Sequence, residues 1–335
     1  MSSKITKVIL DTDPGADDIF ALLWLISLSL QGFAEITAIT TVGGNVPAES
    51  TFWAAHKILK LLNITGIEIG RSTSRIAGNI RDAAHIHGQD GMGNLSDSLP
   101  EVTQPDKDIF AQARRADEII IEQLSQFPGE IDLVAIGPLT NLATAEIKKP
   151  GILKQARSIV IMGGAFDCPG NVTPESEFNI AFDPQAAATV FASHEQIVVL
   201  PMDVTNQLVL TPAMLTYITK TSTTSKLALF IQQLGQFMFQ TNLAHRETKG
   251  VEGCLMHDAA TIAYLFYPET LWLQRARVEI ETVSKFTQGK TLRDRRHFPK
   301  TNPNAFIATQ VDSTSLLAAL LEDLKYLLTS SISPQ

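Results

Sequence analysis

The sequence predicts a single α/β domain over residues 1–335, with an open, mainly parallel sheet flanked by helices. Two observations indicate this fold. Short apolar, β-branched segments alternate along the chain with longer segments of helical spacing. The expected strands end at glycine or aspartate, and no linker rich in proline, glycine or serine divides the chain. Because ligands of such sheets bind beyond the carboxyl ends of the strands, we expect the active site at that edge.

The elements are predicted in an alternating order. The first strand, 8–10, leads through an acidic turn into a helix with the apolar run 19–30. Further strands are expected at residues 35–42, 67–70, 131–136, 158–162 and 196–200. Helices are expected at residues 48–62, 109–126, 184–191, 212–220, 226–240 and 256–266.

Two parts of the chain fall outside this alternation. The long polar segment 71–108 is predicted to be a loop, either a lid or an insert. Near the end, 277–283 and 305–311 are predicted to be late strands that could form an antiparallel edge, followed by a terminal helix at 313–328.

Composition narrows the classes of function. The chain has 335 residues, 44% of them hydrophobic, and a formal charge of −8 without a cluster of Lys or Arg, so a nucleic-acid partner is not expected. Cys168 and Cys254 show neither metal spacing nor a disulfide framework, which fits a reducing compartment. The chain enters a strand almost at once, and the run 19–30 is too short to span a bilayer. We therefore expect a cytoplasmic protein that does not bind membranes.

The turn after the first strand is unusually acidic. Four carboxylates fall within eight residues, namely Asp11, Asp13, Asp17 and Asp18. Pro14 and Gly15 suit a tight turn between them, and a helix cap alone would need one aspartate. No Lys or Arg lies between Lys7 and Lys57 to neutralise the group. Buried carboxylates without basic partners indicate a shared hard cation.

Further motifs follow this turn in a recognisable order: 42–45 (VGGN), 87–88 (HG), 135–141 (AIGPLTN), 162–164 (MGG), 177–179 (EFN) with 183–184 (DP), and 257–258 (HD). With these motifs the chain resembles the inosine-uridine-preferring nucleoside hydrolases. The resemblance implies an enzyme that hydrolyses the N-glycosidic bond of ribonucleosides to ribose and free nucleobase in nucleoside salvage. It also implies a homo-oligomer, a dimer or a tetramer.

The same resemblance implies a Ca²⁺ site. Its ligands would be the carboxylates of Asp13, Asp18 and Asp258 and the backbone carbonyl of Ile136. Such hard oxygen ligands suit Ca²⁺ and leave coordination positions for water and substrate hydroxyls. Threonine is common in the family where Ile136 stands here, and a backbone ligand tolerates that change.

Substrate contacts are implied in the same way. The residues expected at the ribose hydroxyls are Asp17, Asn45, Asn171, Glu177 and Asn179. Met162 would pack against the sugar, and His87 matches the family's loop histidine. The segment 240–246, with His245 and Arg246, would face the nucleobase. His85 has no such support.

Cleavage of the N-glycosidic bond passes through an oxocarbenium-like ribosyl cation. The active site must therefore activate a water molecule on one face of the ribose and stabilise the departing base on the other. The site would place a metal-bound water beside Asp13, and Asp13 would act as general base, so that direct attack inverts the anomeric centre. His257, next to the expected ligand Asp258, is the candidate proton donor to the base. As an isolated residue it would be read as a capping or core histidine.

Two other functions stay open at this point. A haloacid-dehalogenase-type phosphatase would use Asp11 as nucleophile with Mg²⁺, but Pro14-Gly15 followed by two further aspartates does not favour it. The chain could also be a catalytically silent protein that binds Ca²⁺ or a ribonucleoside. A ribose-release assay separates that protein from an enzyme, and base preference is left open by the sequence.

Overall fold

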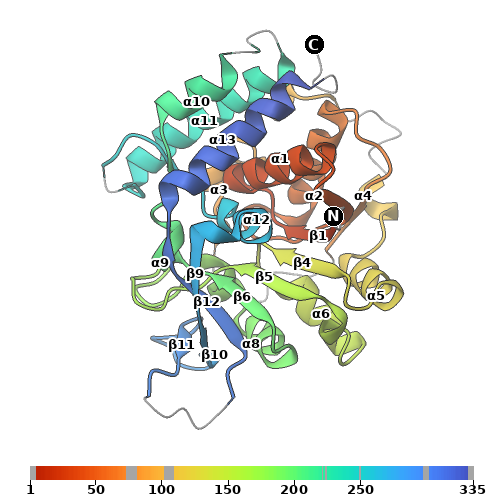
Figure 1. Cartoon of the computed structure of the whole chain (residues 1–335), viewed down its shortest axis with the longest axis vertical. Coiled ribbons are helices and arrows are strands. Elements are labelled where there is room, and N and C mark those ends of the chain that lie inside the picture. The colour runs from red at the N-terminus through yellow and green to blue at the C-terminus, as the bar shows by residue number, and fades with distance from the viewer. Residues whose placement is uncertain are drawn as a thin grey trace.

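The computed structural model describes residues 5–72, 81–101, 109–220, 222, 225–248, 250–296 and 302–330. A central sheet lies between two groups of helices, as Figure 1 shows. Eight strands form this sheet: β1 (Thr6–Thr12), β2 (Ala34–Thr41), β3 (Glu68–Gly70), β4 (Ile131–Ala135), β5 (Ser158–Met162), β6 (Ile197–Leu200), β9 (Leu271–Ala276) and β12 (Ala305–Val311). The expected α/β fold with an open sheet is confirmed.

The order of the strands determines where a ligand can bind. Within the sheet they run β3-β2-β1-β4-β5-β6-β12-β9, and every pair is parallel except β12 with β9. The order reverses direction between β1 and β4, so the connections from these neighbouring strands leave toward opposite sides. Such a switch point opens a crevice at the carboxyl ends of the strands. The acidic turn follows β1 directly and therefore lies at this crevice.

Helices cover both faces of the sheet (Figure 1). On one side lie α1 (Ala16–Leu30), α2 (Ala48–Leu61), α10 (Pro212–Thr219), α11 (Lys226–His245), α12 (Ala259–Phe266) and α13 (Ser313–Thr329). On the other side lie α5 (Ala116–Gln126), α6 (Thr140–Lys148) and α8 (Pro184–Ser193). Each group packs its apolar side chains into its own core cluster against the sheet.

Helix α1 lies at the centre of the larger core. Its residues from Ala16 to Leu28 are all buried, including Trp24 and Phe20, because α12 and α13 cover the face that points away from the sheet. A helix that is apolar all round must be enclosed in this way. Its amino-terminal end, which carries Asp17 and Asp18, is consequently held rigidly. Within the described ranges, none of the helices combines the length and apolar character that a membrane span needs.

Shorter elements complete the chain. They are α3 (Ala84–His87), α4 (Ile109–Gln112), α7 (Phe178–Phe182), α9 (Met202–Thr205), the pair β7 (Val209–Leu210) with β8 (Cys254–Leu255), and the pair β10 (Val278–Ile280) with β11 (Thr291–Arg293). Among the described residues, 3₁₀ turns lie at Ser96–Ser98, Leu153–Gln155 and Pro268–Thr270.

The structure corrects several expected boundaries. The predicted helix 109–126 is broken into α4 and α5, because residues 113–115 leave the helix where Arg71 pairs with Arg115. The antiparallel edge exists, but its outer strand is β9, which the prediction missed. The predicted strand 277–283 is confirmed in part: β10 covers 278–280 and is antiparallel, but it pairs with β11 outside the main sheet. Helix α3 lies in the predicted loop 71–108, of which 73–80 and 102–108 are outside the described residues.

Candidate active site

The acidic turn between β1 and α1 is fixed by one side-chain and one backbone hydrogen bond to Asp18. Asp18 accepts at Oδ1 from the Thr12 hydroxyl at 2.6 Å and at Oδ2 from the Gly15 N–H at 3.0 Å. Gly15 is the N-cap of α1, so the second contact satisfies a backbone donor that the helix leaves free. One Asp18 carboxylate thus ties the end of the strand to the start of the helix.

Asp13 lies between two loops that follow neighbouring strands. Its Oδ2 accepts from the Asn45 backbone N–H at 2.7 Å, whereas its Oδ1 is buried and has no hydrogen-bond partner among the described residues. Gly44 and Gly137 flank the carboxylate so closely that a Cβ at either position would collide with an oxygen of Asp13. The two glycines therefore make room for this side chain. Its Oδ1 is left without the hydrogen-bond partner that a buried carboxylate oxygen normally has.

Three carboxylates form a compact buried group. Oxygens of Asp17, Asp18 and Asp258 all lie within 4.8 Å of one another. Burial, and for Asp18 the charge of Asp17, raises the pKa of both Asp17 and Asp18 from 3.8 to about 6. Burial and the neighbouring carboxylates also raise the pKa values of Asp13 and Asp258 well above the usual range. Such a cluster is costly unless protons or a cation neutralise it.

The arrangement suits a hard cation. All the donors are oxygens, and within the described part of the chain the basic side chain paired with the cluster is His87, 3.9 Å from Asp17 through Nδ1. The Ile136 carbonyl accepts from Asn179 Nδ2 at 3.0 Å and keeps a second lone pair. The compact group contains Asp17 where the sequence suggested Asp13, and Asp13 lies next to it with its free oxygen. The four expected ligands and Asp17 all stay candidates for binding the cation.

A cavity of about 540 Å³ opens above this cluster. The sequence-predicted residues that line it are Asp17, Asp18, Asn45, His87, Ile136, Met162, Asn171, Glu177, Asn179, His257 and Asp258. They come from the ends of several strands and from loops, as expected for a switch-point crevice. The volume is in the range of pockets that enclose a small organic ligand.

One wall of the cavity is built at the start of α7. Glu177 is the N-cap, and its buried carboxylate accepts the N–H groups of Asn179 at 2.8 Å and Ile180 at 3.2 Å. A third N–H, from Gly164, reaches the same carboxylate at 2.8 Å. Burial is the largest influence and raises the pKa of Glu177. Asn179 in turn donates to the backbone carbonyls of Ile136 and Met162, so its side chain links α7 to the ends of β4 and β5.

Two histidines of the cavity, His87 and His257, are mostly neutral. His87 accepts at Nδ1 from the Ala16 N–H at 3.1 Å, and Nδ1 of His257 lies 2.7 Å from the hydroxyl of Thr205. Burial lowers the pKa of each ring to about 4. Both imidazoles are therefore mostly unprotonated at pH 7. A proton donated by His257 would come from a minor, strongly acidic form of the ring.

Two predicted site residues lie elsewhere. Asp13 does not line the cavity but lies beneath it. His245, the last residue of α11, packs edge-on against His85 with ring centroids 5.2 Å apart, in a shallower neighbouring pocket. His85 contacts both pockets, so it connects His245 to the cavity.

Several lining residues were not anticipated from the sequence. They include Arg81, Asp82, Thr173 and Glu247. Thr205 was also missed, although its hydroxyl contacts His257. These side chains come from loops and helix ends without a recurring motif, and Thr205 lies 52 positions before its partner. A sequence pattern offers no signal for such contacts.

Comparison with known proteins gives a consistent result. Residues 8–318 match the model of the family described as "Inosine-uridine preferring nucleoside hydrolase". A protein of that name from Leishmania major is 31% identical over 321 residues, covering 95% of this chain and 97% of its own. The "Non-specific ribonucleoside hydrolase RihC" of Salmonella paratyphi A is 37% identical over 310 residues, covering 91% and 93%.

Solved structures agree with this match. A plant nucleoside hydrolase, PpNRh1, is similar with a TM-score of 0.82 and 30% identity, covering 96% of this chain and 99% of its own. A purine-preferring ribonucleoside hydrolase from Gardnerella vaginalis has a TM-score of 0.86 at 25% identity, with the same coverage.

Proposed function

Because this chain belongs to the inosine-uridine preferring nucleoside hydrolase family, it is an N-ribohydrolase, and we propose that it uses Ca²⁺ to cleave ribonucleosides to ribose and free nucleobase in nucleoside salvage. The observation that carries the proposal is the position of the carboxylate cluster at the base of the 540 Å³ cavity. A metal there would lie within reach of a ligand enclosed by the cavity walls.

The walls supply groups for the ribose. Polar side chains that line the cavity, above all Asp17, Asn45, Glu177 and Asn179, can bind hydroxyl groups. Glu177 accepts three backbone N–H groups and is therefore held in one orientation. Met162 offers an apolar surface to the sugar, and Asn171 lies exposed at the rim. Fixed groups of this kind convert binding energy into orientation of the glycosidic bond.

Asp13 is the proposed general base. Burial and the charges of Asp18 and Asp17 raise its pKa, which strengthens the carboxylate as a proton acceptor. Its unpartnered Oδ1 is the atom that would receive the proton of the attacking water. When bound, Ca²⁺ would supply charge that lowers the pKa of a water molecule and orients hydroxyl groups, with Asp13, Asp17, Asp18, Asp258 and the Ile136 carbonyl as its candidate ligands.

His257 is the proposed proton donor to the departing base. The ring lines the cavity, and its Nδ1 is engaged with Thr205, which leaves Nε2 to face a ligand. Its lowered pKa makes the protonated ring a strong acid but a scarce one at pH 7. His87, in contact with the turn of α1, and His245, reached through His85, are proposed contacts for the nucleobase side.

The alternatives fit the structure less well. A phosphatase would need Asp11 as nucleophile, but Asp11 is fully buried, accepts hydrogen bonds from Thr40 and Asn141, and does not line the cavity. A silent binding protein would not need a buried base beside a proton donor. We further propose a single domain over residues 1–335, a cytoplasmic location and assembly into a dimer or tetramer.

The proposal is tested by measuring ribose release from a panel of purine and pyrimidine ribonucleosides, with the corresponding 2′-deoxyribonucleosides and p-nitrophenyl phosphate as controls. We expect equal amounts of ribose and free base, much slower turnover of the deoxy compounds, and no phosphate release. Tight nucleoside binding without ribose would indicate the silent protein, and phosphate release would indicate the phosphatase.

A further inference from the structure

The loop that joins β5 to α7, residues 163–177, carries two of the residues assigned above to the ribose, Asn171 and Glu177. Helix α7 itself supplies two of the N–H groups that hold the Glu177 carboxylate. The third comes from Gly164, at the opposite end of the loop. The orientation of Glu177 therefore depends on where the backbone at Gly164 lies.

Thr291, the first residue of β11, fixes this backbone. Its hydroxyl donates to the Ala165 carbonyl at 2.8 Å and accepts from the Ala165 N–H at 3.1 Å, so one buried side chain holds both polar groups of the residue after Gly164. Gly164 has a φ of +86°, and a Cβ there would meet Thr291 Cγ2 at 2.8 Å. The glycine thus allows both the left-handed turn and the close approach of the threonine.

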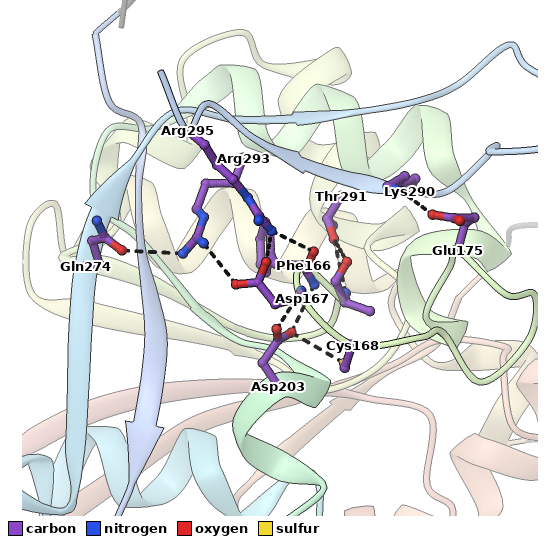
Figure 2. Close-up of polar contacts among 11 residues, drawn as sticks. Phe166, Asp167, Cys168, Glu175, Asp203, Gln274, Lys290, Thr291, Arg293 and Arg295 are labelled. Carbon is purple, nitrogen blue, oxygen red and sulfur yellow. Dashed lines mark hydrogen bonds and ion pairs between the residues drawn. The ribbon is translucent and has the colours of Figure 1, made fainter. Parts of the chain in front are cut away.

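The rest of the β10–β11 hairpin holds the same loop from outside, as Figure 2 shows. Arg293 donates to Asp167 at 2.9 Å, and Lys290 forms an ion pair with Glu175. The Ser176 hydroxyl donates to the Gln288 carbonyl at 2.6 Å. These contacts lie on both sides of Asn171, so the hairpin spans the loop that it holds.

The loop is also held at its base. Asp203, at the start of α9, accepts the N–H groups of Phe166 at 2.9 Å and Asp167 at 2.7 Å (Figure 2). The Met202 N–H donates to the Gly164 carbonyl at 2.9 Å. With Asp203 on one side and Thr291 on the other, residues 164–166 have their polar backbone groups paired, and little freedom is left for Gly164 to move.

We propose that Thr291 is a positioning residue for ribose binding, which acts through Ala165 and Gly164 to hold the Glu177 carboxylate against the substrate. Thr291 does not line the cavity and touches no group assigned to the chemistry. The hairpin lies outside the main sheet, so its polar contacts to the loop give it a function that the fold alone does not require. The inference rests on the proposed function, since Glu177 must meet the ribose for its position to matter.

The experiment compares Thr291→Val with Thr291→Ser. Valine keeps the shape of the side chain but removes both hydrogen bonds to Ala165, whereas serine keeps the hydroxyl. We expect kcat/KM for ribonucleosides to fall about tenfold in Thr291→Val and to stay within about twofold of the wild type in Thr291→Ser. Thr309→Val is the matched control, because its exposed hydroxyl donates only to Trp272 on β9.

A double-mutant cycle distinguishes positioning from general stability. In a Glu177→Gln background, Thr291→Val should lower kcat/KM less than about twofold further, because the group that it positions is already altered. The ratio of the changes in KM and kcat should match that of Glu177→Gln. Additive losses, equal losses in the valine and serine variants, or wild-type activity in Thr291→Val would each overturn the proposal.

A surface variant covers the case in which Thr291→Val does not fold. Arg293→Met removes one of the two ion pairs to Asp167 on the outer side of the loop, the other being with Arg295, and it should lower kcat/KM about threefold. Unchanged activity in that variant would overturn the proposal. Failure of the proposed function itself is recognised separately, because the wild-type protein would then release no ribose at all.

Discussion

Replacing Asp13 by asparagine tests the proposed base and the cation site with the smallest change of shape. The amide oxygen can take over the hydrogen bond from the Asn45 N–H that Asp13 Oδ2 now accepts. The amide nitrogen then faces Gly137, at the position of the oxygen that has no partner. The variant should keep the fold, because no volume is added in the narrow space between Gly44 and Gly137.

The magnitudes follow from these contacts. Two unsatisfied amide hydrogens in a buried position cost about 1–3 kcal/mol, while removal of one negative charge relieves repulsion with Asp17 and Asp18. Since the two effects oppose each other, we expect the unfolding free energy of the chelated variant to lie within about 2 kcal/mol of the wild type. Turnover should fall about 10³-fold or more, because the base and a candidate cation ligand are lost together.

The assay is ribose release at saturating nucleoside and Ca²⁺, with urea unfolding of the chelated proteins alongside. Asp11→Asn is the matched control, because Asp11 is also buried with one unpartnered oxygen. Burial raises its pKa and hydrogen bonds from Thr40 and Asn141 lower it, whereas the pKa of Asp13 also responds to the charges of Asp18 and Asp17. It should keep at least about a tenth of wild-type activity. Asp13→Asn with more than a tenth of wild-type turnover, or equal losses in the two variants, would refute the assignment.

Two further predictions concern titratable groups. In the chelated protein the raised pKa values of Asp17 and Asp18, about 6 against an ordinary 3.8, mean that the folded state holds more protons than the unfolded chain between about pH 4 and 6. Their contribution to stability is therefore present below about pH 4 and lost as the pH rises through 6, so the increase in Tm caused by Ca²⁺ should grow over that interval. A Ca²⁺ effect on Tm that does not change with pH would contradict this. His257→Ala should slow natural nucleosides by about 10²- to 10⁴-fold and leave p-nitrophenyl riboside, whose phenolate needs no proton, nearly unchanged. Equal losses on both substrates would exclude His257 as the proton donor.

The parallel part of the fold could be predicted because its signals are local. Strands such as β4 and β5 are short apolar runs that end at glycine, and their alternation with helices specifies a parallel sheet. Strand β9 was missed because its burial is irregular: only Leu271 and Ala276 are buried, at its two ends. Its pairing with β12 is a long-range contact, which a local sequence pattern does not predict.

The candidate site likewise contains residues that could be predicted from the sequence and residues that could not. Asp13 and Asp18 were predictable because they lie in one continuous turn, and the strand order brings Ile136 beside them. Thr205 and Thr291 were not, because each acts on a residue far along the chain and their hydroxyls have no characteristic spacing. The separation of His245 from the cavity depends on where α11 ends, five residues beyond the predicted end.

The most direct test of the Ca²⁺ site is a titration of fully chelated protein with Ca²⁺, in which bound metal and ribose release are measured on the same samples. Because prolonged chelation is needed to empty a buried site, removal is first verified by metal analysis. We expect about one Ca²⁺ per chain, with activity that rises in proportion to the bound ion, since oxygen ligands without clustered His or Cys select a hard cation. Full activity in the chelated protein, or active protein that holds stoichiometric zinc and no calcium, would contradict the account.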